Sequence, residues 1–247
     1  MKMNLSRGTG TALAAVASSM TLFAGQAHAA PIWDGDAANG TGVFAHIGSN
    51  CAAPSSITTP TSSWRGKIWR YHKPVGSPRC ESKGIALNGV DHNFDPGPGA
   101  TAKYYLGWES RLSSTVDNNA IFQWKSYPNA DQNWPVVLKM IDGKLTLIHR
   151  PPNQSSPDVV WQKPIAANDW NHIVLGLNLS DRSGDGSIEL WFNGQKQTFT
   201  NNLQEWKGRT WDSANQPKWG LYGAEAHDVT HDVEGLKVGR SYDDVKQ

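Results

Sequence analysis

The chain has 247 residues, 18% of them charged, and a formal net charge of +1. This near-neutral balance argues against nucleic acid as the main partner, because binding phosphates requires a basic surface. It argues in the same way against a heavily sulfated polymer.

The first 29 residues have the pattern of a secretory signal peptide. Lys2 and Arg7 give a positive start, residues 9–24 are small or apolar without charge, and residues 27–29 form a small-x-small cleavage pattern. The apolar stretch is shorter than the ~20 residues that a membrane span needs. We therefore expect a secreted, extracellular monomer that makes no membrane contact, with residues 30–247 forming a single domain.

Cys51 and Cys80 form an even pair in a chain expected to be exported, and this predicts a disulfide bond between them. The bond would close a loop of about 30 residues and stabilise the fold by on the order of 3 kcal/mol. No spacing typical of a zinc site accompanies the pair.

The rest of the chain predicts strands. Residues 66–73, 102–112 and 119–127 are rich in aromatic residues and indicate the first three strands. Residues 136–150 and 186–200 each predict a hairpin, because Asp142-Gly143 and Asn193-Gly194 are strong turn signals. Residues 170–179, 218–223 and 233–239 indicate further strands. Helical periodicity is nearly absent, so the sequence predicts an all-β sandwich or jelly roll of two curved antiparallel sheets.

Tryptophan is over-represented, with 12 residues in the chain. We expect most of these side chains to fill the core and about a third to line a groove, where indole rings offer flat faces to sugar rings. The composition therefore favours a carbohydrate ligand.

The C-terminal segment Lys218-Trp219-Gly220-Leu221-Tyr222 has the most specific pattern. Lys218 and Tyr222 are four residues apart on a predicted strand, so both side chains lie on one face with Gly220 between them. A small residue between two long polar ones leaves room for a ligand. An ordinary strand with a half-buried Tyr has the same spacing, so spacing alone leaves both interpretations open.

This Lys-aromatic-Gly-aliphatic-Tyr pattern resembles the catalytic strand of jelly-roll polysaccharide lyases, a group that includes heparin lyase I, the glucuronan lyases and, more distantly, the alginate lyases. The glucuronan-lyase-like family, polysaccharide lyase family 20, is the best match. Residues 170–174 and 188–194 also resemble the paired strands of concanavalin-like jelly rolls. Further motifs follow in family order along most of the chain: His72, Arg79-Cys80-Glu81, Glu109-x-Arg111 and Gln123-Trp124-Lys125.

The resemblance implies β-elimination at a 4-linked uronic acid, in glucuronan first and alginate second, so the expected partner is an acidic polysaccharide. Such an enzyme removes the weakly acidic proton at C5, neutralises the C6 carboxylate and protonates the departing O4. The carboxylate needs cations or hydrogen-bond donors where charge develops. The proton steps need groups such as His and Tyr.

The resemblance also implies an acid and a base. We expect His72 as base and Tyr222 as acid, or Tyr222 alone in both roles. Lys125 stands where the family often has His, and this departure keeps His92 and His46 open as alternative bases.

The remaining site predictions concern the C6 carboxylate and the sugar chain. Gln123 joins Lys125, His72 and Tyr222 in the catalytic set. The expected substrate-binding residues are Arg79, Arg111, Trp124 and Lys218.

The resemblance to heparin lyase I-like proteins further implies a structural calcium ion near Asp212. Two other functions remain open. A glycoside hydrolase would need two facing carboxylates, for which Glu109 and Glu189 are isolated candidates. A non-catalytic, lectin-like module would carry groove aromatics without a cluster of His, Tyr and cations, since the jelly-roll fold by itself does not determine activity.

Overall fold

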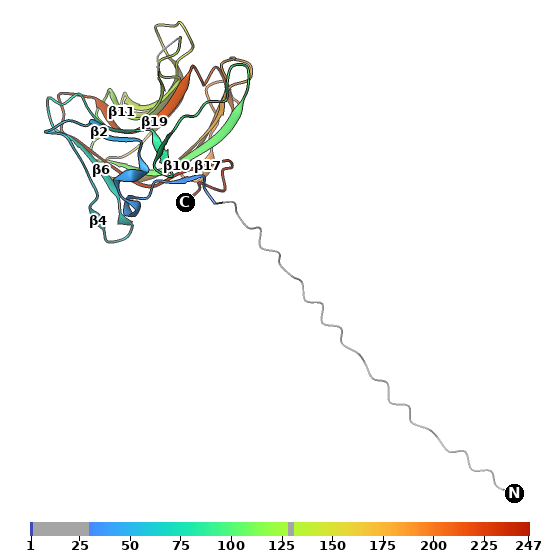
Figure 1. The fold of residues 1–247 in the computed structure, drawn as a ribbon, viewed down its shortest axis with the longest axis horizontal. Helices are drawn as coiled ribbons and strands as arrows, with labels where there is room; N and C mark the ends of the chain where they lie inside the picture. The colour runs from blue at the N-terminus through green and yellow to red at the C-terminus, as the bar shows by residue number, and fades with distance from the viewer. Residues whose placement is uncertain (2–29, 128–130) are drawn as a thin grey trace.

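The structure is a computed structural model that describes residues 1, 30–127 and 131–247 (Figure 1). The predicted signal segment, residues 1–29, lies outside the described residues apart from Met1. Within the described ranges the helical segments are two short 3₁₀ turns, η1 (Ala37–Asn39) and η2 (Thr41–Val43). In the same part of the chain, no helix has the length and apolarity needed to cross a membrane.

Sheet A is the larger of two main sheets, with nine strands among the described residues. These are β1 (Trp33–Asp34), β3 (Ser56–Thr58), β6 (Trp69–Lys73), β10 (Ala102–Leu112), β15 (Trp170–Leu179), β16 (Ser187–Phe192), β17 (Gln195–Lys196), β18 (Trp206–Lys207) and β20 (Val229–Gly239). The strand order is β17-β16-β15-β10-β20-β6-β3, with β1 beside β20 and β18 beside β16.

Sheet B has seven strands in the described part of the chain. These are β2 (His46–Asn50), β7 (Arg79–Lys83), β11 (Asn119–Tyr127), β12 (Val136–Ile141), β13 (Lys144–His149), β14 (Asp158–Pro164) and β19 (Ala214–Gly223). The order is β14-β13-β12-β11-β19-β7-β2. Two small ribbons, β4 (Thr61–Ser62) with β5 (Gly66–Lys67) and β8 (Ile85–Leu87) with β9 (Val90–His92), complete the strands.

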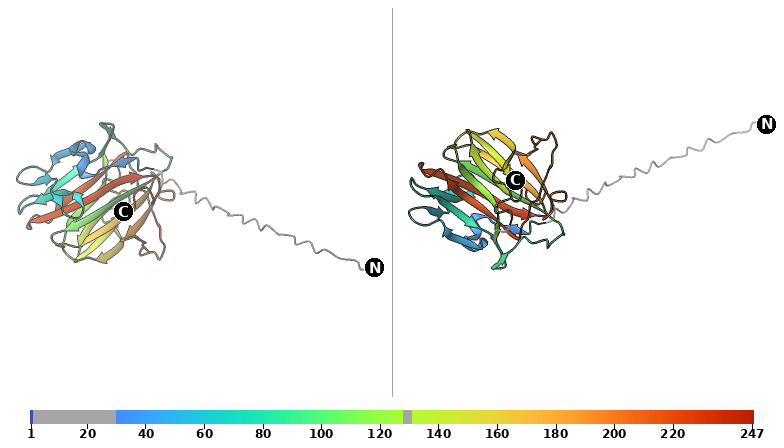
Figure 2. Two further views of the ribbon diagram at one scale, coloured as in Figure 1. Left: turned by 90° about the horizontal axis from the view of Figure 1, so that it is seen from below. Right: turned by 90° about the horizontal axis from the view of Figure 1, so that it is seen from above.

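The two sheets form curved layers with the hydrophobic core between them. Figure 1 shows the layer with β11 and β19 lying over the layer with β6 and β10, and Figure 2 shows the strands side by side from below and above. The strands pair antiparallel in both sheets. Alternation of side chains places one face of each strand in a single large buried cluster. The predicted jelly roll of two curved antiparallel sheets is confirmed.

Two predicted hairpins have the expected turns. Asp142 and Gly143 have φ values of 51° and 69°, and they connect β12 to β13. Asn193 and Gly194 have φ values of 50° and 77°, and they connect β16 to β17. Positive φ at both central residues matches the right-handed twist of the flanking strands, which explains the Asp-Gly and Asn-Gly sequences.

Tryptophan makes up a large part of this core. All of the chain's Trp residues lie in the described ranges, and the buried ones are Trp33, Trp69, Trp108, Trp124, Trp161, Trp211 and Trp219. The rings pack on one another: Trp33 stacks on Trp219 with centroids 5.7 Å apart. Seven of the twelve are buried, so the expectation that most of them fill the core is confirmed.

The predicted disulfide is also confirmed. Cys51 and Cys80 are bonded across a sequence separation of 29 residues. Because Cys80 lies on β7, the bond joins the loop after β2 to the strand that pairs with β2 at one edge of sheet B.

Candidate active site

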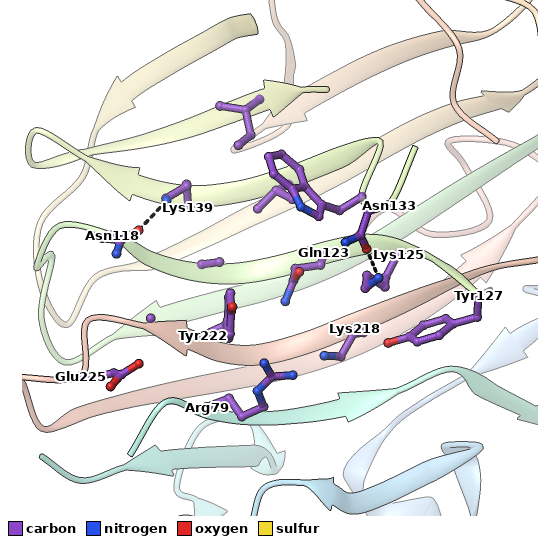
Figure 3. A pocket seen from close by; sticks show the side chains of 15 residues that line it. Arg79, Asn118, Gln123, Lys125, Tyr127, Asn133, Lys139, Lys218, Tyr222 and Glu225 are labelled. Atoms are coloured by element: carbon purple, nitrogen blue, oxygen red, sulfur yellow. Dashed lines mark hydrogen bonds between the residues drawn. The ribbon is translucent and has the colours of Figure 1, made fainter. Parts of the chain in front are cut away.

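A pocket of about 500 Å³ opens on the face of sheet B that points away from the core. Its side chains come from β7, β11, β12, β13, β19 and the loops between them (Figure 3). Among the described residues that line it, the cations are Arg79, Lys125, Lys139 and Lys218, and the acid is Glu225. The pocket is therefore a cationic region on a protein that is nearly neutral as a whole.

Side chains alternate between the two faces of each strand, so every second residue of a strand can point into the pocket. On β19, Lys218 and Tyr222 both line the pocket, as their spacing predicts. On β11, Gln123 and Lys125 do the same, and Gln123 is the direct partner of Lys218 in the register of the two strands. Four of the predicted site residues thus meet on neighbouring strands of one sheet.

Gly220 lets β7 approach β19 closely. It lies opposite Glu81 with a φ of 137°, and a Cβ at this position would be 2.2 Å from the carbonyl oxygen of Cys80. Only glycine fits both the backbone conformation and the available space. The glycine therefore brings the side chains of β7 beside those of β19.

A buried carboxylate, Glu81, organises the floor of the pocket. One oxygen accepts a hydrogen bond from Lys218 Nζ at 2.5 Å, and the other accepts one from Gln123 Nε2 at 2.5 Å. Lys218 and Glu81 are only 2% and 3% exposed. Burial lowers the pKa of Lys218 and outweighs the opposing effect of Glu81. The carboxylate thus fixes two polar side chains of the pocket.

Arg79 and Tyr222 form the open side of the pocket. The guanidinium of Arg79 lies over the Tyr222 ring, 4.6 Å from its centroid, and 4.0 Å from Glu81. Tyr222 is 40% exposed, so its hydroxyl is reachable from solvent. Figure 3 shows the two side chains next to each other across from Gln123 and Lys218.

Lys125 is a cation of the pocket whose pKa is lowered toward neutral pH. Burial, then the nearby charges of Lys218 and Arg79, lower its pKa to about 8. Its ammonium donates to Asn133 Oδ1 and lies 4.9 Å from the centroid of the Tyr127 ring. Its charge therefore titrates just above neutral pH.

Several lining residues were not predicted from the sequence. Burial raises the pKa of Tyr127 to about 12. Lys139 donates to Asn118 Oδ1 at 2.6 Å on the far rim. The other unpredicted lining residues are Ala120, Asn133, Trp134, Val137, Ile148, Gly223 and Glu225. Tyr127 and Glu81 were predictable, since each lies two residues beyond a predicted site residue on the same strand.

His72 does not reach this pocket. It lies on β6 of sheet A, with Nε2 3.1 Å from the Asp228 carboxylate. The preceding residue, Tyr71, faces the core, where its hydroxyl lies 2.8 Å from Ser82 Oγ on β7. Because successive side chains point to opposite faces, His72 points away from sheet B. The predicted pairing of His72 with Tyr222 is therefore wrong.

Trp124 and Arg111, predicted to bind substrate, also lie elsewhere. Trp124 is fully buried on the core face of β11, and its Nε1 donates to the carbonyl of Thr210 at 2.9 Å. Arg111 lies on β10 of sheet A and donates through Nε to Asp232 at 3.2 Å. Neither residue lines the pocket, so both placements correct the prediction.

The reserve bases lie outside the pocket as well. His46 Nε2 is 3.3 Å from the Asp91 carboxylate, and the His92 ring packs edge-on against Phe94 with centroids 4.7 Å apart. Among the described residues, no histidine lines the pocket.

The two acids considered for hydrolysis belong to sheet A. Glu109 forms an ion pair with Arg65, and Glu189 forms one with Lys103 at 2.5 Å. They do not line the pocket and do not form the facing pair that hydrolysis needs.

The surroundings of Asp212 do not fit a calcium ion. Its carboxylate accepts from Arg209 Nη2 at 2.7 Å, from the backbone N–H groups of Asp131 and Gln132 at 3.2 Å each, and from Ser126 Oγ at 3.3 Å. These are donors, one of them cationic, whereas calcium takes six to eight oxygen ligands. In the described ranges, no group of three or more His, Cys, Asp or Glu side chains is placed to hold a metal.

Solved structures share the fold at low sequence identity. A family 7 alginate lyase in complex with its product is 12% identical, over 74% of this chain and 83% of that one, with a TM-score of 0.52. Alginate lyase AlgAT5 of polysaccharide lyase family 7 is 11% identical, over 79% and 85%, with a TM-score of 0.50. The cellulose-induced protein Cip1 is 7% identical, over 78% and 89%, with a TM-score of 0.52. No curated protein matches the chain.

A sequence model of the polysaccharide lyase family matches residues 86–236, more than half of the chain. The matched region contains Gln123, Lys125, Lys218 and Tyr222, four of the five predicted site residues that line the pocket; the fifth, Arg79, precedes it. This chain therefore belongs to the polysaccharide lyase family and is a polysaccharide lyase.

Proposed function

We propose that this polysaccharide lyase is secreted and cleaves a 4-linked uronic-acid polymer by β-elimination, with glucuronan as the first substrate and alginate as the second. The observation that carries the proposal is the convergence of Arg79, Lys125, Lys218 and Gln123 around the exposed Tyr222. A uronate carboxylate needs such cations and donors, because the charge that develops in the transition state spreads onto it.

The residues divide into two roles. Arg79, Lys125 and Gln123 face the C6 carboxylate and lower the energy of the carbanion-like state, while Lys218 is paired with Glu81. Tyr222 acts as both base and acid, which was one of the two alternatives open from the sequence. As phenolate it takes the C5 proton; the C–H electron pair forms the C4–C5 double bond, the C4–O4 bond breaks, and the same proton is returned to O4.

The choice of polymer has two separate supports. The order of the sequence motifs resembles that of glucuronan lyases, which favours glucuronan. The fold is shared with two alginate lyases, and this supports alginate as the second candidate. The signal-like segment at residues 1–29 supports secretion. Secretion would bring the enzyme to such polymers outside the cell.

The test is a panel of polyuronates assayed by ultraviolet absorbance of the unsaturated product. Polyglucuronate, polymannuronate, polyguluronate and heparin are compared at several pH values, each with and without calcium. The largest signal is expected on polyglucuronate, and the same signal is expected when calcium is chelated. If no uronan gives a signal while the protein still binds one of them, the lectin-like alternative replaces the proposal.

A further inference from the structure

A buried histidine contacts β19 from the core side, opposite the active-site pocket. His231 lies on β20 of sheet A and is fully buried. Its Nδ1 is 2.9 Å from the carbonyl oxygen of Gly220 on β19, and its Nε2 is 2.8 Å from the hydroxyl oxygen of Ser110 on β10. The ring therefore connects two strands of sheet A to the strand of sheet B that carries Lys218 and Tyr222.

The partners of the ring define its protonation. A carbonyl oxygen can only accept a hydrogen bond, so Nδ1 carries the proton and donates to Gly220. Burial lowers the pKa of His231 to about 4, so the ring is neutral near pH 7 and Nε2 accepts from the Ser110 hydroxyl. Both ring nitrogens are thus satisfied, and the orientation of the ring is fixed from both ends.

The Gly220 carbonyl belongs to a β-bulge. Between Trp219 and Tyr222, β19 has two residues where the paired strand β11 has only Ile121. An extra residue disrupts the ladder locally and changes the direction of the side chains that follow it. This bulge lies between Lys218 and Tyr222, so it sets where the Tyr222 ring lies relative to the pocket cations.

We propose that His231 is a positioning residue, which fixes the bulge of β19 through the Gly220 carbonyl and so holds the Tyr222 hydroxyl in place for proton transfer. This role rests on the proposed function, in which Tyr222 moves the proton. His231 itself does not touch the substrate, because it is fully buried behind the strand. A contact at this place affects turnover, since a misplacement of about 1 Å can lower a rate about a hundredfold.

Two amides at position 231 test the hydrogen bond to Gly220. The amide nitrogen of asparagine takes the place of Nδ1, whereas that of glutamine lies one bond further out, near the place of Nε2. His231→Gln should lose the bond to Gly220, so kcat on the polyuronate should fall about tenfold to a hundredfold while KM stays near the wild-type value. His231→Asn keeps the donor and should recover most of the lost kcat. Steady-state kinetics and the melting temperature are measured for each variant.

His149→Asn is the matched control. His149 is another buried histidine bonded to a backbone carbonyl, with Nε2 2.9 Å from the oxygen of Arg209, and it does not line the pocket. Its bond uses Nε2, so the shorter asparagine loses it. We expect the melting temperature to fall and kcat to stay at the wild-type value. An equal loss of kcat in His149→Asn and His231→Gln would reflect general destabilisation and would overturn the positioning role.

Ser110→Ala decides the matter if His231→Gln does not fold. It removes the hydroxyl that donates to Nε2 and leaves the ring anchored at Gly220 alone, so kcat should fall by a smaller factor with KM unchanged. If the wild type cleaves a uronan and no folded variant of His231 or Ser110 lowers kcat, His231 is not a positioning residue, and the proposed function stands. If the wild type cleaves no uronan, the proposed function and the positioning role are both overturned.

Discussion

Glu81 determines how much positive charge the pocket presents. Its carboxylate compensates Lys218 at 2.5 Å and also holds Gln123, while Arg79 stays at 4.0 Å and Lys125 contacts Asn133 instead. The charge of the buried Lys218 is thus balanced within the protein, and Arg79 and Lys125 are the cations that a substrate carboxylate would meet with least competition.

The hydroxyl of Tyr222 can be tested by Tyr222→Phe. Because the side chain is 40% exposed and Phe keeps the ring, folding and binding should be nearly unchanged. Loss of the group that moves the proton should lower kcat at least a hundredfold, since positioned acid–base groups contribute ~10²–10⁴-fold. The measurement is the initial rate of unsaturated product, with the melting temperature as the check on folding.

Tyr127→Phe is the matched control for that variant, because Tyr127 lines the same pocket. Burial raises the pKa of Tyr127 to about 12, so its hydroxyl is a poor proton carrier near neutral pH. We expect it to keep most of the activity. Should Tyr222→Phe retain more than about a tenth of the wild-type rate, Tyr222 is not the catalytic acid–base.

The charge of Lys125 predicts an alkaline limit to activity. Its lowered pKa of about 8 means that the ammonium is charged below pH 8 and becomes neutral as the pH rises through that value. The neutral amine no longer stabilises the C6 carboxylate, so kcat/KM should fall above about pH 8. Lys125→Arg keeps its charge to beyond about pH 12 and should move this limit upward. An unchanged alkaline limit in Lys125→Arg would assign the titration to another group.

The errors at Trp124 and Glu81 have one cause. Side chains two residues apart share a face of a strand. Trp124 lies between Gln123 and Lys125 and therefore points to the opposite face, whereas Glu81 shares the face of Arg79. The same alternation correctly placed Lys218 and Tyr222 on one face. Applied strictly, it would also have assigned Trp124 and Glu81 to the correct faces of their strands. This part of the site could be predicted from the sequence.

At the scale of the element, the bounds of the long strands were more predictable than the order of the strands in the two sheets. The bounds of β10, β11 and β15 match the predicted 102–112, 119–127 and 170–179, because aromatic and β-branched residues alternate there over nine or more positions. The short strand β7 was missed, although it carries Arg79. Strand order depends on contacts between distant segments, so no local pattern could place His72 and Tyr222 in different sheets.

The close approach of β7 and β19 can be tested by Gly220→Ala. A Cβ would lie 2.2 Å from the Cys80 carbonyl and would force a φ of 137° on alanine, so the free energy of unfolding should fall by about 3 kcal/mol or more. Gly143→Ala is the control, because Gly143 has a φ of 69° but open space around it, and it should cost only about 1 kcal/mol. Urea denaturation compares the two. Equal losses would show that crowding at Gly220 is unimportant.

At the scale of the whole molecule, charge is arranged locally rather than in total. The chain carries a formal net charge of +1, yet four cations and one acid line the pocket among the described residues. Elsewhere acids form ion pairs with cations. On sheet A, for example, Glu189 pairs with Lys103 and with Lys196 at 2.5 Å each. A neutral composition was therefore consistent with an acidic substrate, since the field that attracts an anion is set by the pocket.

The Cys51–Cys80 disulfide closes a loop that links the two sheets, because β3 and β6 of sheet A lie between the two cysteines and Cys80 itself is in sheet B. A cross-link over a separation of 29 residues restricts the unfolded chain by about 3 kcal/mol in the chain-entropy estimate. Replacing both cysteines by serine should lower the free energy of unfolding by about that amount. Urea denaturation of the double variant and of the oxidised wild type measures the difference, and treating both with a reductant gives the control, since only the wild type should lose stability. If the two proteins unfold at the same urea concentration before reduction, the bond contributes nothing to stability.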